Sequence, residues 1–113
     1  MENAVLEKSV DFAVRIVKLY QYLAEEKKEW ILSKQLLRSG TSVGANIREA
    51  LQGQSKADFV AKMSISLKEA AESQYWLELL YRTGYLTEEQ YKSIGADCDE
   101  LAKLLTAIVK SSR

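Results

Sequence analysis

The chain has 113 residues without proline or histidine, and its 16 basic residues equal its 16 acidic residues. A chain of this length forms one domain with one modest core, and 47% apolar with 28% charged residues is a globular balance. Zero net charge argues against a generally basic nucleic-acid binder. The lack of histidine excludes Ser-His and Cys-His nucleophile pairs and imidazole metal ligands.

The cysteine content and the apolar runs indicate a cellular compartment. The single cysteine, Cys98, cannot form a disulfide within the chain, which suits a reducing cytoplasm. It falls on an apolar seam, so we expect a buried and unreactive thiol. No apolar run approaches the ~20 residues of a membrane span, and the first residues lack a signal-peptide pattern. We therefore expect a cytoplasmic protein without a membrane partner.

The spacing of apolar residues predicts four helices joined by short turns. Their expected ranges are about residues 5–26, 32–52, 56–83 and 88–110. No alternation of period two is long enough for a sheet. The fold class is therefore all-α, and short connections predict an antiparallel up-down-up-down four-helix bundle in a single domain.

Local signals mark the ends of these helices. Ser55 is a good N-cap for the third helix, and Thr87 begins a capping box for the fourth. Gly53 and Gly84 follow the second and third helices, where a C-terminal cap tolerates positive φ. The charged segment 25–29, EEKKE, is expected to be an exposed connection.

The first predicted helix carries two neighbouring apolar seams. One seam contains Leu6, Val10, Ala13, Val17, Tyr20 and Ala24. The other contains Val5, Phe12, Ile16, Leu19 and Leu23. Together they make a face wider than a coiled-coil stripe, so we expect both seams to line the core.

The second predicted helix is short of bulky side chains in its middle, where Gly40 and Gly44 stand four residues apart. Each glycine inside a helix costs ~1 kcal/mol relative to alanine, so we expect close contact with a neighbouring helix here. The residues predicted to make this close packing are Gly40, Val43, Gly44 and Ile47. A phosphate-binding Walker loop is excluded, because it needs four residues between its glycines, a following lysine and a preceding strand.

A polar stripe runs along the same helix. It contains Arg38, Ser42, Asn46 and Glu49, which are spaced four, four and three residues apart. Such a stripe forms a buried hydrogen-bond network, an inter-subunit contact or a solvated surface. Spacing alone favours the solvated surface.

Aromatic and leucine side chains crowd the end of the third predicted helix, where residues 75–81 include one charged residue. Successive helix residues differ by ~100°, so these side chains point in every direction and one core cannot cover them all. Part of this girdle is expected to contact another subunit or to lie under the turn at Tyr85 and Leu86. The residues proposed for an oligomer contact are Tyr75, Trp76 and Leu79.

The charged side chains allow two further kinds of site. A basic edge for nucleic acid would use Lys8, Arg15, Lys18 and Arg48, together with Arg38. A solvated face is the favoured interpretation of that edge. An all-oxygen magnesium or calcium site would use Glu49, Glu69, Glu72 and Glu78. Salt bridges to neighbouring arginine and lysine residues are favoured instead, so no metal or cofactor is expected.

The segment 33–50, SKQLLRSGTSVGANIREA, resembles the signature of the four-helix-bundle proteins encoded in intervening sequences of bacterial 23S rRNA genes. The similarity extends to residues 12–13, 16–20, 55–56, 58–59, 68–70 and 75–77, and so covers nearly the whole chain. The resemblance implies a four-helix protomer and a ring-shaped homopentamer. It implies no settled biochemical activity.

A similar group, the accessory variability proteins of diversity-generating retroelements, is a basic pentamer that binds reverse transcriptase and RNA. The chain departs from that group in having no net positive charge, which argues against carrying over nucleic-acid binding. The polar stripe matches the family signature, and this match favours a structural or interface role for it over idle surface.

Three hypotheses about function follow. The first is a non-enzymatic, cytoplasmic homo-oligomer, with five copies, that acts as a scaffold or adaptor. The second is RNA binding through a basic surface that assembly repeats, since avidity strengthens a weak patch. The third is an enzyme, which requires a pocket with convergent polar groups.

Overall fold

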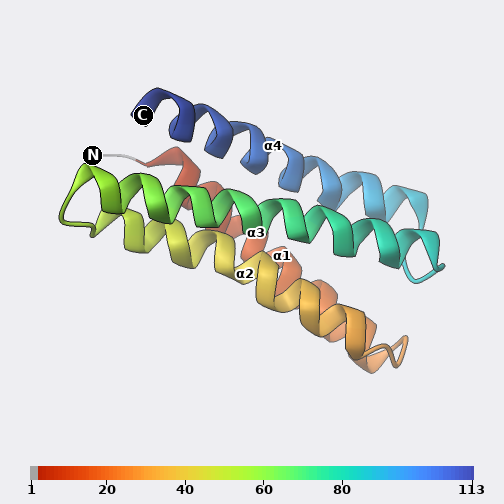
Figure 1. Ribbon diagram of the computed structural model, residues 1–113. Coiled ribbons are helices and arrows are strands. Elements are labelled where there is room, and N and C mark those ends of the chain that lie inside the picture. Colours follow the sequence, from red (N-terminus) through yellow and green to blue (C-terminus); the bar gives the residue numbers. More distant parts are fainter. Residues whose placement is uncertain (1–2) are drawn as a thin grey trace.

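The computed structural model describes residues 3–113 and consists of four antiparallel helices (Figure 1). They are α1 (Ala4–Glu25), α2 (Ile31–Leu51), α3 (Lys56–Arg82) and α4 (Glu88–Ser112). Over the described residues there is no strand, so the prediction of an all-α four-helix fold is confirmed. None of the helices within residues 3–113 has the length and apolar character that a membrane crossing requires.

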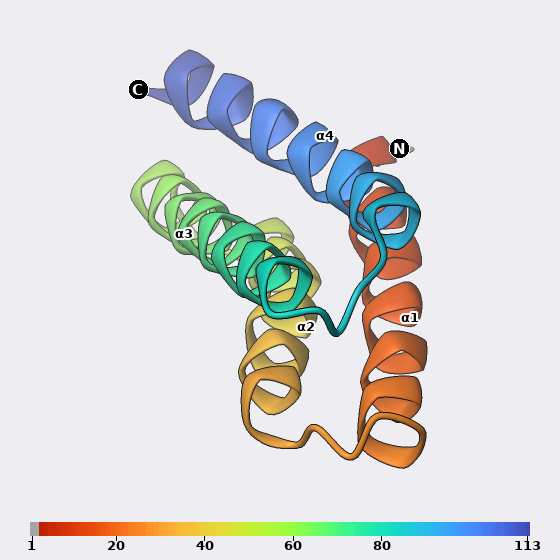
Figure 2. The same cartoon turned by 90° about the vertical axis from the view of Figure 1, so that its right-hand side faces the viewer.

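Each helix packs mainly on its neighbours in sequence. α2 lies between α1 and α3, while α4 packs along α3 and touches α1 less extensively. Viewed along the bundle, α1 and α3 lie on opposite sides of it (Figure 2). Exposed ion pairs join α1 to α4, with Lys8 Nζ 3.2 Å from a Glu100 carboxylate oxygen. α1 therefore has one close neighbour, α2, and one looser neighbour, α4.

The helix starts follow ordinary capping chemistry. The Asn3 side chain accepts a hydrogen bond from the Leu6 amide at 3.0 Å. Ser55 Oγ caps α3 in the same way, at 3.1 Å from the Asp58 amide. The capping box at Thr87 is complete, with distances of 3.1 and 2.9 Å. These caps satisfy amide groups that have no partner inside the helix.

The connection from α1 to α2 differs from the expectation. Glu29 was expected to be exposed, but it is buried and its carboxylate caps α2. It accepts hydrogen bonds from the amides of Leu32 at 2.9 Å and Ser33 at 2.8 Å. The free amides and the positive end of the helix dipole favour a carboxylate at this place. The side chain of Trp30, the residue just before the helix, makes no capping hydrogen bond.

Gly53, expected at a C-terminal cap that tolerates positive φ, follows α2 but does not adopt positive φ. Among the described glycines only Gly84 has positive φ, at 89°. α2 ends instead in tightened turns, in which the Gln52 and Gly53 amides each donate to a carbonyl three residues earlier, at 3.1 Å. Because these bonds satisfy the last carbonyls, no left-handed residue is needed there.

The core uses one apolar seam of α1 and leaves much of the other uncovered. Phe12, Ile16 and Leu23 are fully buried, as expected. Val10 and Val17 are 42% and 38% exposed, so the prediction that both seams line the core is wrong. Because α1 has two neighbouring helices, they cover only one side of it. Gly44 of α2, which lies beside these valines, has no side chain to cover them.

Candidate functional site

The middle of α2 lies unusually close to α1. A Cβ atom built on Gly40 would stand 2.8 Å from Ile16 Cγ1, and one on Gly44 would stand 2.9 Å from Ser9 Oγ. Ordinary contacts of a Cβ atom are 3.4 Å or longer. Val43 and Ile47, from the same predicted set, are fully buried. The glycines thus serve the approach of α1, while the two larger residues fill the core.

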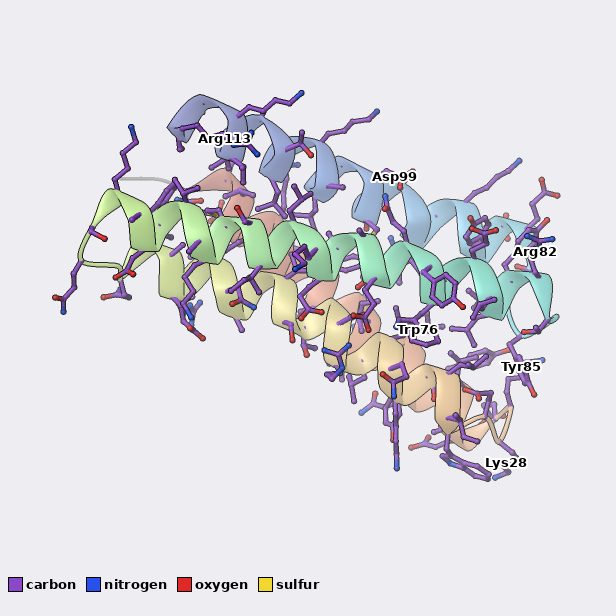
Figure 3. The ribbon with its side chains drawn as sticks, viewed as in Figure 1. Lys28, Trp76, Arg82, Tyr85, Asp99 and Arg113 are labelled. Carbon is purple, nitrogen blue, oxygen red and sulfur yellow. The ribbon has the colours of Figure 1, made fainter. Side chains whose placement is uncertain are left out.

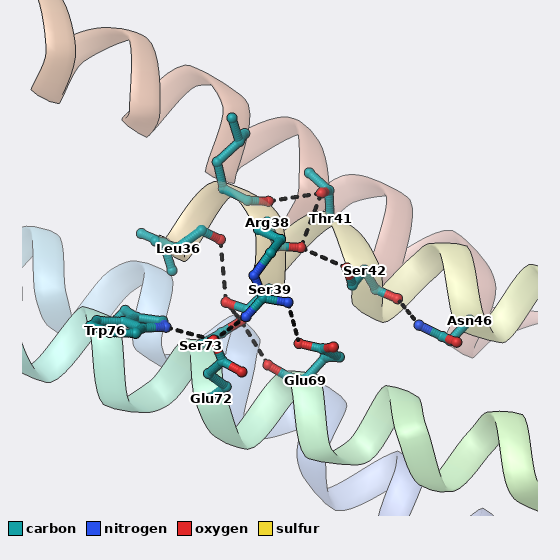
Figure 4. A network of polar contacts seen from close by, with 11 residues as sticks. Leu36, Arg38, Ser39, Thr41, Ser42, Asn46, Glu69, Glu72, Ser73 and Trp76 are labelled. Carbon is teal, nitrogen blue, oxygen red and sulfur yellow. Dashed lines mark hydrogen bonds and ion pairs between the residues drawn. The ribbon is translucent and has the colours of Figure 1, made fainter. Parts of the chain in front are cut away.

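Buried serines hold α2 against α3. Ser39 Oγ lies 2.8 Å from Ser73 Oγ (Figure 4), and Ser66 Oγ donates to the Val43 carbonyl at 2.7 Å. Ser73 Oγ donates to the Glu69 carbonyl at 2.9 Å, whereas Ser39 Oγ lies farther, 3.4 Å, from the Leu36 carbonyl, which favours Ser39 as the donor of the pair. Hydroxyl groups that are satisfied in this way allow two helices to approach closely without an unpaired polar atom.

Sequence reasoning missed these serines. Ser9, Ser66 and Ser73 are completely buried but had been assigned to no seam. Ser66 and Ser73 are seven residues apart, which places them on one side of α3 next to the buried Ala70. That spacing is the signal that would have revealed them.

An ion-pair cluster lies at the edge of this contact. Arg38 of α2 pairs with Glu72 and, at 3.5 Å, with Glu69 of α3. Trp76 projects from α3 toward α2 (Figure 3), and its Nε1 donates to the Glu72 carboxylate at 2.9 Å. This hydrogen bond, followed by that from Arg38, lowers the pKa of Glu72 against the opposing effect of burial. The hydrogen bond that Arg38 donates to Glu72, followed by the charges of Glu72 and Glu69, raises the pKa of Arg38.

The cluster fixes geometry more than it stabilises the fold. The Arg38 side chain is 51% exposed, and exposed ion pairs contribute only ~0–1 kcal/mol because solvent screens them. It joins α2 to α3 beside the buried serine contacts. The indole of Trp76 covers the cluster on one side and is half-buried.

The polar stripe of α2 does not form one network. Ser42 Oγ donates to the Arg38 carbonyl at 2.7 Å, and the Asn46 amide donates to the Ser42 carbonyl at 2.9 Å (Figure 4). These bonds run along the helix's own backbone. Glu49 is separate and pairs with Lys62 of α3 at 2.9 Å. Only Arg38 of the stripe reaches the Glu69 and Glu72 carboxylates of another helix.

The acidic residues considered for a metal site are used in ion pairs. Glu69 and Glu72 face Arg38, while Glu78 pairs with Arg82 at 3.1 Å. Within residues 3–113 no group of three or more potential ligands comes together. In the same range every buried side-chain nitrogen or oxygen has a hydrogen-bond partner.

The basic residues considered for nucleic acid divide between α1, where Arg15 and Lys18 line one hollow, and α2. Lys8 and Arg15 face α4, where they pair with Glu100 and Asp97. Lys18 and Arg48 have no ion pair within the described part of the chain. Lys18 lies beside the exposed valines of α1, and Arg48 lies near the end of α2.

The aromatic girdle divides between core and surface. Leu77 and Leu80 are buried, and Tyr81 stacks on Tyr91 of α4 with ring centroids 4.6 Å apart. Trp76 and Leu79, both proposed for an oligomer contact, are half-buried. Tyr75, the third, is 54% exposed and packs edge-on against Trp76.

A hollow of about 550 Å³ opens between α1 and α4. Its lining includes apolar side chains, among them Leu19, Leu86 and Ile94. Its guanidinium group, Arg15, is already bonded to Asp97 at 2.5 Å and to the Ser93 hydroxyl at 2.9 Å. Lys18, Glu89 and Gln90 also line this hollow.

Comparison with known proteins agrees with this geometry. The family model described as 23S rRNA-intervening sequence protein matches residues 1–107. The chain is similar to a crystallised protein of unknown function from the S23 ribosomal protein family of Bacteroides thetaiotaomicron VPI-5482. The two are 62% identical, cover 95% of this chain and 99% of that chain, and superpose with a TM-score of 0.94. No curated protein matches the chain.

Proposed function

Because the chain belongs to the family of 23S rRNA-intervening sequence proteins, we propose that it is a non-enzymatic scaffold or adaptor that acts as a homo-oligomer. The observation that carries this proposal is the exposed apolar surface of α1. Val10, Val14 and Val17 expose 42%, 48% and 38% of their surface on one side of that helix. Contiguous apolar surface of this kind marks a contact with another protein.

The interior of the protomer supports the same proposal. Its core is filled, and its buried polar atoms are satisfied within residues 3–113. Side chains that would bear chemistry are used for structure: Glu72 fixes Arg38, and Glu29 caps α2. A ring of five copies in the cytoplasm, the form that the family resemblance implies, is the proposed assembly.

RNA binding gains less support. Lys8, Arg15 and Arg38 are neutralised by carboxylates of neighbouring helices. An assembled basic surface would depend mainly on Lys18 and Arg48. Those two residues lie on different helices and neutralise few phosphates, so we retain the scaffold as the proposed function.

Light scattering coupled to size exclusion tests the proposal. The protomer has a mass of 12.8 kDa, and the proposal predicts a single species at a multiple of that mass at micromolar concentration. A protein that stays at the protomer mass under those conditions refutes it.

A further inference from the structure

Two exposed apolar faces lie on different helices of the protomer. The valine face consists of Val10, Val14 and Val17 on α1, and it lines an apolar hollow of about 400 Å³ together with Ala13 and Gly44. The outer face of α3 consists of Ile65, Lys68 and Tyr75, of which Ile65 is 40% and Tyr75 54% exposed. α1 and α3 lie on opposite sides of the bundle (Figure 2), so neither face can cover the other within one chain.

The contacts of α2 show which parts of α1 and α3 lie at the same level along the bundle. At residues 43–44 of α2, Ser66 bonds to the Val43 carbonyl and Ser9 lies against Gly44. One turn earlier in α2, Ser73 bonds to Ser39 and Ile16 lies against Gly40. Residues 9 and 66 therefore lie at about the same level, as do residues 16 and 73. Both pairs differ by 57 positions, so α1 and α3 run in the same direction with an offset of about 57 residues.

This offset determines which residues of α1 in one copy would face which residues of α3 in the next copy, if the two copies stood side by side. A rotation about an axis parallel to the bundle moves nothing along that axis, so residues at equal levels come together. Applied to the exposed faces, the offset places Asp11 of one copy opposite Lys68 of the next. It also places Lys18 opposite Tyr75 and Val14 opposite Ala71.

These three pairs of facing residues are chemically complementary. Asp11 and Lys68 have opposite charges, and neither forms an ion pair inside the described part of its own chain. Lys18, also without an ion pair there, would approach the face of the Tyr75 ring, which attracts cations. Val14 would pack against a small alanine. Complementary charges beside an apolar contact fix its register, and the burial of Val14 against Ala71 contributes to its driving force.

We propose that the valine face of α1 binds the outer face of α3 on a second copy of this chain, with the two helices parallel and at equal levels. The inference rests on the proposed homo-oligomer and names the two surfaces that form it. Because the surfaces differ, each copy has one of each, and the contact repeats head to tail until a ring closes.

Two single substitutions test the pairing. Val14→Arg blocks the valine face and Tyr75→Arg blocks the outer face of α3. Both sites are about half exposed, so each variant should keep the helical circular dichroism of the wild type. Each variant alone is expected to lose the assembly and run at the protomer mass. Ile31→Arg changes a side chain that is 77% exposed but lies on neither face, and it should keep the wild-type mass.

Mixing the two variants gives the sharpest outcome. Each variant retains the face that the other has lost, so an equimolar mixture should contain a species with the mass of two protomers. A Tyr75→Arg variant that keeps the wild-type mass would show that the valine face binds something else, and so would a mixture without the dimer. Either result overturns this inference but leaves a homo-oligomer standing. A monomeric wild type instead refutes the proposed function.

The charge pair gives an independent check of the register. Asp11→Lys should raise the protein concentration at which half of the assembly dissociates by up to about fivefold, the equivalent of one exposed ion pair of ~1 kcal/mol. Combining it with Lys68→Asp should restore the wild-type concentration. Failure of the second substitution to restore assembly would exclude the equal-level register.

Discussion

Replacing Gly40 and Gly95 with alanine, one at a time, should change stability in opposite directions. Both glycines lie inside helices, Gly40 in α2 and Gly95 in α4. Alanine in a helix interior is favoured over glycine by ~1 kcal/mol, and this gain is common to both sites. The two sites differ only in what the added methyl group meets.

At Gly40 the methyl group meets a filled space. It would stand 2.8 Å from Cγ1 and 2.9 Å from Cγ2 of Ile16, so both branches of that side chain block it and a rotamer change cannot remove the clash. Ile16 is completely buried, and overpacking of this kind costs ~1–3 kcal/mol. At Gly95 no atom lies within 4 Å of the added carbon.

We therefore expect Gly95→Ala to raise the free energy of unfolding by ~1 kcal/mol, and Gly40→Ala to lower it by up to ~2 kcal/mol. The difference between the two variants, ~1–3 kcal/mol, isolates the contact with Ile16 because the propensity gain cancels. Urea unfolding followed by circular dichroism measures both values, at one protein concentration since assembly shifts apparent stability. If Gly40→Ala gains as much stability as Gly95→Ala, the close approach of α1 and α2 is refuted.

Three further predictions concern titration and binding. Burial, followed by the charges of Asp99 and Asp97, raises the pKa of Cys98 to about 12. Ellman's reagent at pH 8 should therefore react with this thiol only after denaturant is added. Rapid labelling of the native protein would contradict this prediction. Because that pKa is raised above its usual value, stability should fall as pH rises from about 9 toward 12, and Cys98→Ala should reduce this fall. The pKa of Glu72 is lowered, chiefly by the Trp76 hydrogen bond, so its stabilising effect is present above pH ~4.5 and is lost as pH falls through the lowered value. Glu72→Gln should flatten that part of the acid unfolding curve, and an unchanged curve would show that the pair contributes nothing. Titration with structured RNA at two salt concentrations should show no salt-dependent binding, whereas a steep salt dependence would favour the RNA hypothesis.

The fold could be predicted because its local signals agree with one another. The Thr87 capping box, the glycine at Gly84 and the seam through Phe12 and Ile16 all describe amphipathic helices with defined ends. Such signals depend on residues a few positions apart, which a single sequence contains. The observed helix bounds accordingly fall within a residue or two of the expected ones.

The errors arise where a side chain's partner lies elsewhere in the chain. Glu29 belongs to a charged segment, and only its contact with the α2 amides shows that it is a buried cap. Ser66 and Ser73 have polar side chains, but they can be buried because the Val43 and Glu69 carbonyls accept their hydrogen bonds. Val10 has core-like spacing, yet whether a neighbour covers it depends on how many helices surround α1.

The candidate site was predictable in part for the same reason. The sequence placed Gly40 and Gly44 at a close helix contact, which the geometry shows for both. It grouped Arg38 with Glu49 because they share a helix side, whereas each pairs with a different part of α3. Helical spacing identifies neighbours on one surface but gives no information about the partner that surface meets.

Light scattering of an equimolar mixture of the Val14→Arg and Tyr75→Arg variants tests whether the valine face of α1 binds the outer face of α3 between copies. Each variant alone should have the 12.8 kDa protomer mass, and the mixture should contain a species of twice that mass. A mixture that remains entirely at the protomer mass would contradict it.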